Sequence, residues 1–153
     1  MKTFLIIILF MFAFDGCSTK NAFSSFNITL AQENSEDNIQ SSKIKDGEII
    51  DGLVTAIYLN KVIPQTYKEN EYFYVYLYTK HNNDHIKFLL NGNEALKVEE
   101  LEAENMFTYL TSFKANWSRY YLVAFKSEDA NLSFSVKNAQ FSSNKLIFEK
   151  EEQ

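Results

Sequence analysis

The sequence predicts an all-β domain built as a two-sheet sandwich. Short apolar runs alternate with clusters of turn-forming residues, which is typical of strands. Seven or eight such runs fit into about a hundred residues, the spacing of a two-sheet sandwich. Fourteen Phe and nine Tyr residues can fill the core of one domain. The single cysteine lies near the N-terminus, so packing alone must stabilise this domain.

Turn chemistry bounds the predicted strands. Asp51-Gly52 is a candidate bulge, and Pro64 suits a loop or a sheet edge. Asn91-Gly92-Asn93 is a strong hairpin signal. In chain order, strands are predicted at Glu48–Leu59, Glu71–Lys80, His85–Leu90, Met106–Phe113, Arg119–Lys126, Leu132–Lys137 and Lys145–Glu149.

The segment Glu94–Asn105 fits neither pattern over its whole length. It is rich in helix formers but has no clean apolar stripe, so a short helix and a polar edge strand both stay open. We prefer a strand over Ala95–Leu101, because a sandwich needs an edge there.

The N-terminus has the pattern of an export signal. Lys2 precedes an apolar run over Phe4–Phe14, which is about half the length that a membrane-spanning helix needs. Gly16 and Cys17 follow, and the segment resembles the lipobox of bacterial lipoproteins. The resemblance implies that residues 1–16 are cleaved and that Cys17 is acylated, with palmitate or a similar chain, and inserted into the lipid bilayer. Ser18 after the cysteine implies the outer membrane. The alternative is a plain secretory signal with a free thiol.

A polar tether is expected after the cysteine. Residues 17–46 are rich in Ser, Asn, Gln, Glu and Lys, and they lack sustained periodicity. Phe23–Leu30 has enough apolar residues to form a short strand or to dock on the domain, and that alternative stays open. The sandwich is expected to cover residues 47–150.

One strand also suggests a family. Trp117–Phe125 resembles the penultimate strand of immunoglobulin-like sandwiches, in which a tyrosine near the strand start holds a corner. With the lipobox and the polar tether, the chain resembles the small single-domain immunoglobulin-like lipoproteins of the Campylobacter group. This resemblance implies a fold and a location at the cell envelope, and it implies no catalytic residue.

Charge and motifs exclude several function classes. The formal net charge of −5 argues against nucleic acid as a partner, because phosphate recognition needs a basic face. The sequence contains no nucleophile elbow, phosphate-binding glycine loop or metalloprotease pair. We therefore expect no enzymatic activity, no cofactor and no metal.

The two histidines are candidate metal ligands. His81 and His85 flank a short polar stretch that contains Asp84, and two imidazoles with a carboxylate could bind a divalent metal. The same stretch has the composition of a loop between two strands. We prefer the loop.

One predicted strand carries an unusual aromatic face. Strand alternation places Phe73, Val75 and Leu77 on the core side. The opposite side carries Tyr72, Tyr74, Tyr76 and Tyr78. This tyrosine face is either a flank covered by a neighbouring element, such as the N-terminal segment, or an exposed platform for ligand contact. We prefer the covered flank.

Asn131 is a candidate glycosylation site. It begins an Asn-X-Ser sequon, and Asp129 stands two residues before it. The extended pattern resembles the acceptor of the periplasmic N-glycosylation system of the same bacterial group.

Two function classes follow. The first is a non-enzymatic binding or adhesion module at the envelope, with a protein or glycan partner. The second is a structural or assembly subunit of an envelope complex.

Overall fold

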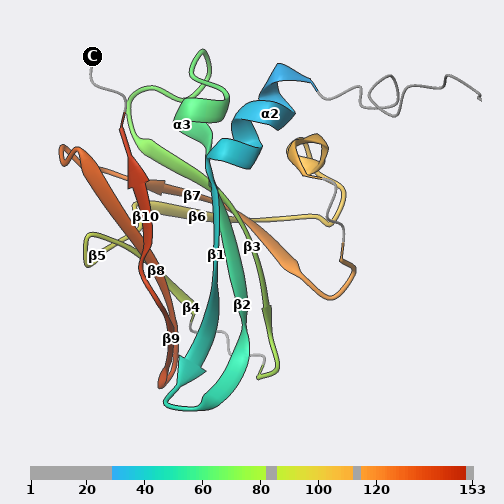
Figure 1. Cartoon of the computed structure of the whole chain (residues 1–153), viewed down its shortest axis with the longest axis vertical. Helices are drawn as coiled ribbons and strands as arrows, with labels where there is room; N and C mark the ends of the chain where they lie inside the picture. The colour runs from blue at the N-terminus through green and yellow to red at the C-terminus, as the bar shows by residue number, and fades with distance from the viewer. Residues whose placement is uncertain (1–28, 82–85, 112–114, 151–153) are drawn as a thin grey trace, which may run out of the picture.

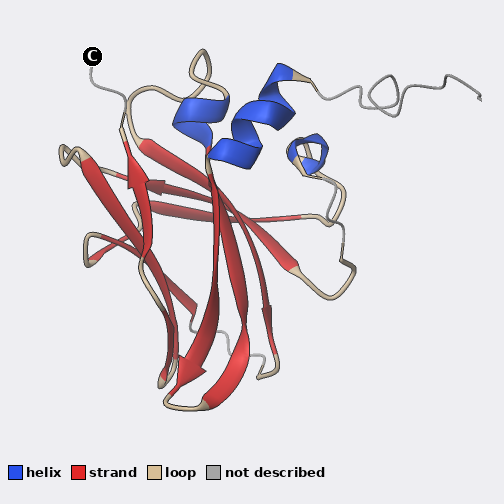
Figure 2. Cartoon of the chain, in the orientation of Figure 1, coloured by secondary structure: helices blue, strands red, loops and turns tan. Residues whose placement is uncertain are grey.

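The computed structural model describes residues 29–81, 86–111 and 115–150. Most of these residues are in strands, and the ten strands join in one antiparallel sheet (Figure 1). Three short helical segments of the described residues gather at one end of the sheet (Figure 2). The predicted all-β class is therefore confirmed. Among the described residues, no helix has the length and apolarity needed to cross a bilayer.

The strands are short and follow one another closely in the chain. They are β1 (Ile39–Asp46), β2 (Ile49–Tyr58), β3 (Glu71–Thr79), β4 (Ile86–Leu90), β5 (Asn93–Glu94), β6 (Lys97–Leu101), β7 (Arg119–Phe125), β8 (Asn131–Asn138), β9 (Phe141–Ser143) and β10 (Leu146–Glu149). The helical segments are α2 (Leu30–Asp37), α3 (Leu59–Val62) and the single turn η2 (Thr108–Leu110).

The sheet curls until its two ends approach each other (Figure 1). The strand order is β5-β4-β8-β9-β1-β2-β3-β7-β6, and β10 also pairs with β8. Between the end strands, the Ala95 amide donates to the Phe88 carbonyl at 3.3 Å and the Leu96 amide donates to the Ala124 carbonyl at 2.8 Å. Instead of two separate sheets, the described strands thus form one continuous path. The three-residue strand β9 connects the two halves.

Two hydrophobic clusters lie on opposite faces of the central strands. The inner cluster fills the curl and includes Phe73, Val75 and Leu77, as the alternation predicts. The outer cluster contains Tyr74, Tyr76 and Tyr120, together with residues of α3 and of η2 and the residues before them. The central strands are therefore covered on both faces at the end of the sheet where the helical segments lie.

The prediction of a tether up to residue 46 is wrong for residues 29–46. Thr29 caps α2 through a capping box with Gln32, and β1 then pairs with β2 along its whole length. The polar residues of β1 have partners: Gln40 bonds the backbone of Ile147, and the Ser42 hydroxyl accepts from the Asn144 amide at 3.0 Å. The folded domain therefore begins by Thr29.

Most other predicted elements are confirmed. β2, β3, β4, β7, β8 and β10 lie where strands were predicted. Ile44 pairs with Gly52 and Lys45 with Ile50, so Asp51 is the extra residue of a bulge. Asn91 and Gly92 both have positive φ, as a two-residue hairpin requires.

The open segment Glu94–Asn105 and the predicted strand that follows it have different outcomes. Lys97–Leu101 is the edge strand β6, so the strand is confirmed and the helix alternative is wrong. The predicted strand at Met106–Phe113 is wrong over its described part, which forms a turn and η2. Asn105 is the cause, because its side-chain oxygen accepts from the Phe107 amide at 2.9 Å and its carbonyl accepts from the Thr108 hydroxyl at 2.8 Å.

Candidate functional site

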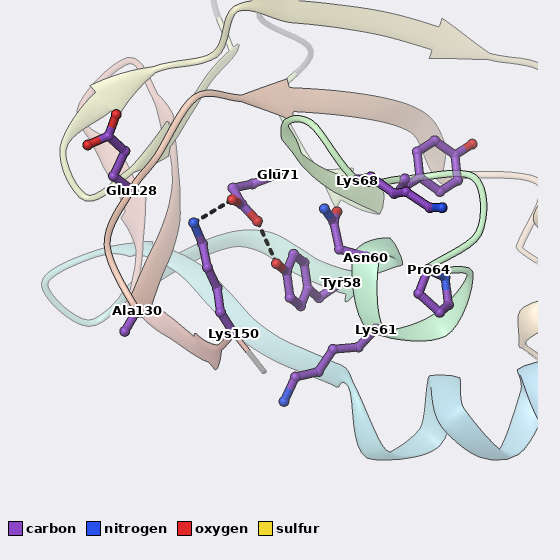
Figure 3. A pocket seen from close by; sticks show the side chains of 10 residues that line it. Tyr58, Asn60, Lys61, Pro64, Lys68, Glu71, Glu128, Ala130 and Lys150 are labelled. Atoms are coloured by element: carbon purple, nitrogen blue, oxygen red, sulfur yellow. Dashed lines mark hydrogen bonds and ion pairs between the residues drawn. The ribbon is translucent and has the colours of Figure 1, made fainter. Parts of the chain in front are cut away.

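A pocket of about 580 Å³ opens beside α3, at the end of the sheet where the helices lie (Figure 3). Its walls come from the end of β2, from α3 and the loop that follows it, from the start of β3, from the β7–β8 loop and from the residue after β10. The lining residues are Tyr58, Asn60, Lys61, Pro64, Tyr67, Lys68, Glu71, Glu128, Ala130 and Lys150.

A buried carboxylate forms the floor of the pocket. The Tyr58 hydroxyl donates to Glu71 Oε2 at 2.5 Å, and the Lys150 ammonium lies 2.6 Å from Glu71 Oε1 (Figure 3). Glu71 is 7% exposed, so these two partners replace the water that its charge would otherwise need. Both carboxylate oxygens are therefore engaged.

The same network holds three distant chain segments together. Lys150 Nζ also donates to the Ser127 carbonyl at 2.6 Å, and the Lys150 amide donates to the Ala130 carbonyl at 3.0 Å. The residue after β10 is thereby fixed to the β7–β8 loop and to the first residue of β3. These contacts connect three walls of the pocket.

The loop between α3 and β3 is clamped by one side chain. Asn60 donates to the Asn70 carbonyl at 2.7 Å and accepts from the Tyr72 amide at 2.8 Å. The Tyr67 ring packs against the Tyr72 ring, with 4.8 Å between the centroids. The apolar wall of the pocket is therefore fixed by both backbone and ring contacts.

The rim carries positive charge. Lys61 and Lys68 have no ion-pair partner among the described residues, whereas Lys150 forms an ion pair with Glu71. Glu128 supplies one carboxylate from the opposite wall. In a chain of net charge −5, this mixed rim favours a polar ligand that both accepts and donates hydrogen bonds.

The tyrosine face is mostly covered. Tyr74 and Tyr76 are buried, Tyr72 is half-buried and Tyr78 is exposed. The exposed-platform interpretation is therefore wrong for Tyr74 and Tyr76. The physical reason is the outer layer, which consists of α2, α3, η2, the residues before η2 and the turn before β7. Tyr74 packs on Phe107 at a centroid distance of 5.1 Å, and Ala31 of α2 packs against the outer cluster.

Burial changes the acidity of these phenols. Burial raises the pKa of Tyr74 to about 12, although a hydrogen bond from Asn105 opposes the shift. Burial also raises the pKa of Tyr76, against hydrogen bonds with Thr111 and Thr55. Both side chains are thus neutral core residues at physiological pH.

His81 lies apart from the pocket and contacts a buried carboxylate. Its Nδ1 lies 2.6 Å from Asp51 Oδ1, and Asn138 Nδ2 donates to Asp51 Oδ2 at 2.9 Å. Burial by itself raises the pKa of Asp51, but hydrogen bonds from His81 and Asn138 outweigh it and leave the pKa below its ordinary value. The His81 ring also stacks on Phe141, so this histidine ties β2, β8 and β9 together.

The other candidate residues lie at the surface or outside the described chain. Asn131 is the exposed first residue of β8, and its carbonyl accepts from Asn91 Nδ2 at 3.1 Å. Glycosylation of Asn131 stays a prediction. Cys17, Asp84 and His85 lie outside the described residues.

No sequence pattern indicates the pocket. Tyr58 ends β2, Glu71 begins β3, and Lys150 follows β10 at a distant point of the chain, so no motif spacing joins all three. Only the sheet topology, which brings β10 beside β8 and the β2–β3 pair around the same end, places them together.

Comparison with known proteins identifies no relative of this chain. No family model matches the chain, and neither a curated protein nor a solved structure is significantly similar to it.

Proposed function

We propose that this protein is a lipid-anchored envelope protein whose folded domain is a non-enzymatic binding module that engages a protein or glycan through the pocket beside α3. The acylated Cys17 attaches it to the bilayer, and Ser18 directs it to the outer membrane. The observation that carries the binding role is a pre-formed pocket of about 580 Å³, a size within the range of ligand sites.

The floor and the rim of the pocket have different roles. The engaged Glu71 carboxylate keeps the shape, while Lys61 and Lys68 on the rim offer charged donors for recognition. The hydrogen bonds between the Tyr120 hydroxyl and the backbone of Ala115 support a relation to immunoglobulin-like sandwiches, which hold a corner in this way.

Cross-linking in intact cells tests the binding site. A photoreactive residue at Lys68, on the rim, should give an adduct of defined mass with the partner. The same residue at Lys45, which is also exposed but lies in β1, is the matched control and should give none. Equal labelling from both positions would contradict a pocket-directed partner.

The anchor is tested separately. Cys17→Ala should remove acyl labelling and release the protein from the membrane fraction, because two or three acyl chains provide the stable attachment. A wild-type protein without acyl groups would show that the anchor assignment is wrong.

An assembly subunit is the second candidate, and one observation favours it. Leu53 and Tyr78 face each other on β2 and β3, and both are exposed at the end of the sheet remote from the helices. Ile49 and Ile50 are exposed on the same strand. A photoreactive residue at Leu53 that gives one stoichiometric protein adduct, with none at Lys68, would favour the subunit.

A further inference from the structure

Four large apolar side chains are exposed on the outer layer of the domain. They are Leu30 at 72%, Met106 at 69%, Tyr109 at 46% and Trp117 at 69% exposure. Soluble domains expose single apolar side chains freely, but a group on one layer marks a contact surface.

The elements that carry these side chains form one unit. The Ser35 hydroxyl of α2 donates to the Leu110 carbonyl of η2 at 2.5 Å, which joins the helix of Leu30 to the turn of Tyr109. Figure 1 shows the start of α2, η2 and the turn before β7 along one side of the molecule.

The turn that carries Trp117 is held by the same buried tyrosines that contact the residues before η2. Tyr74 stacks on Tyr120 at a centroid distance of 6.2 Å, and it also packs on Phe107 just before η2. The Tyr120 hydroxyl in turn bonds both the amide and the carbonyl of Ala115, at 3.2 and 3.1 Å. The buried tyrosines therefore fix the positions of η2 and of this turn relative to each other.

The position of the proposed anchor indicates that this surface contacts the lipid bilayer. Leu30 begins α2, and the chain between it and Cys17 can span at most about 47 Å even when fully extended. The chain from a lipid anchor at Cys17 therefore enters the domain on this side, and the opposite end of β2 lies about 30 Å further away along that strand.

We propose that Leu30, Met106, Tyr109 and Trp117 form a membrane-contact surface that rests on the lipid bilayer holding the Cys17 anchor. This inference depends on the proposed anchor for its location in the cell. Trp and Tyr prefer the headgroup level of a bilayer, and Leu and Met add apolar area at the acyl boundary.

The charges around the surface predict the type of lipid contact. Glu33 on α2 and the exposed Glu102 and Glu104 before Met106 are acidic. The contact is therefore apolar, and anionic lipid does not strengthen it.

The single tryptophan and the single cysteine make the proposal directly testable. A chain that starts at Cys17 contains every described residue, and its thiol can be coupled to a maleimide lipid in phosphatidylcholine vesicles. The vesicles contain lipid brominated near the glycerol end of the acyl chains. Quenching of Trp117 fluorescence by bromine, and its access to iodide in the water phase, are measured before and after coupling.

We expect coupling to make Trp117 sensitive to bromine, to shift its emission to shorter wavelength and to cause loss of iodide quenching. Met106→Ser with Tyr109→Ser should restore iodide access. Ile49→Ser with Leu53→Ser, at the remote end, is the matched control and should leave the protection intact. Circular dichroism establishes that both variants are folded.

The proposal is overturned if coupled Trp117 stays open to iodide and insensitive to bromine, or if the remote-end variant releases it equally. Replacing part of the phosphatidylcholine by phosphatidylglycerol should not increase protection, and a large increase would overturn the apolar contact. The mass of Cys17 in protein from native membranes is read separately. Absence of acyl groups there contradicts the proposed anchor, while the vesicle result still decides whether the surface binds lipid.

Discussion

The side chain of Gln40 bonds both backbone polar groups of Ile147, 107 residues further along the chain. Its Oε1 accepts from the Ile147 amide at 3.1 Å, and its Nε2 donates to the Ile147 carbonyl at 2.5 Å. An amide side chain thus takes the place of a backbone ladder between β1 and β10.

Gln40→Ala should lower the free energy of unfolding by about 1–2 kcal/mol, because two hydrogen bonds are lost at the seam of the sheet. Gln40→Glu keeps the acceptor but cannot donate to the carbonyl, so it should also be destabilising. Denaturant titration measures both. Lys43→Ala, at another exposed position of β1, should have little effect; a loss equal to that of Gln40→Ala would mean that the side-chain bonds do not stabilise the seam.

Tyr74→Ser with Tyr76→Ser should strongly destabilise the domain. Each change removes a buried ring, at about 3–5 kcal/mol, and the sum approaches the whole stability of a small domain. Thermal melting should show a large drop or no folded state. Tyr78→Ser on the same strand face is the matched control, and because Tyr78 is 39% exposed its effect should be small. Unchanged melting of the double variant would restore the exposed-platform interpretation.

Alkaline pH should unfold the domain through its buried phenols. Burial raises the pKa of Tyr74 from 10.0 to about 12, so the folded state binds the proton more tightly than the unfolded state does. This contribution to stability is complete below pH 10 and is lost as pH rises towards 12. At roughly 1.4 kcal/mol per pKa unit, the loss can reach about 3 kcal/mol. Denaturation midpoints measured over this range should fall less steeply for Tyr74→Phe, and equal slopes would contradict the assignment.

Acid should weaken the contact between β2 and β8. The pKa of Asp51 lies below its ordinary value of 3.8 in the folded state, so its contribution to stability is present above that pH and is lost as pH falls through the lower folded value. Asp51→Asn should reduce this acid dependence and should cost about 1–3 kcal/mol near neutral pH, because the contacts with His81 and Asn138 are disturbed. Urea unfolding at several pH values measures both effects. Asp46→Asn, at an exposed position, should reproduce neither.

Alternation made the centre of the fold predictable. Tyr72–Tyr78 alternates so regularly that β3 and its inner face of Phe73, Val75 and Leu77 follow from the sequence alone. In β1, by contrast, only Ile39 and Ile44 are apolar, because the remaining positions face solvent or bond the seam with their side chains. A strand that is stabilised by polar side chains has the composition of a linker, so sequence patterns could not distinguish the two.

The outer layer was predictable only in outline. The tyrosine face indicated that some element covers it, and the N-terminal segment was a named candidate. The contributions of α3 and of the turn at Thr108–Leu110 depend on local backbone and turn hydrogen bonds that apolar periodicity does not record. The pocket was not predictable, since Tyr58 and Glu71 meet Lys150 only through the closing of the sheet.

The seam between β1 and β9–β10 also leads us to expect an order of events in folding. β1 is synthesised early, but the strands that cover its outer edge follow at the other end of the sequence, so the sheet has a high contact order and should close late. Until then β1 presents an unpaired edge, of the kind through which partly folded chains aggregate. Gln40, Ser42, Lys43 and Lys45 make that edge polar and charged. The polar composition that makes β1 look like a linker should therefore also oppose aggregation of the chain before β9 and β10 are in place.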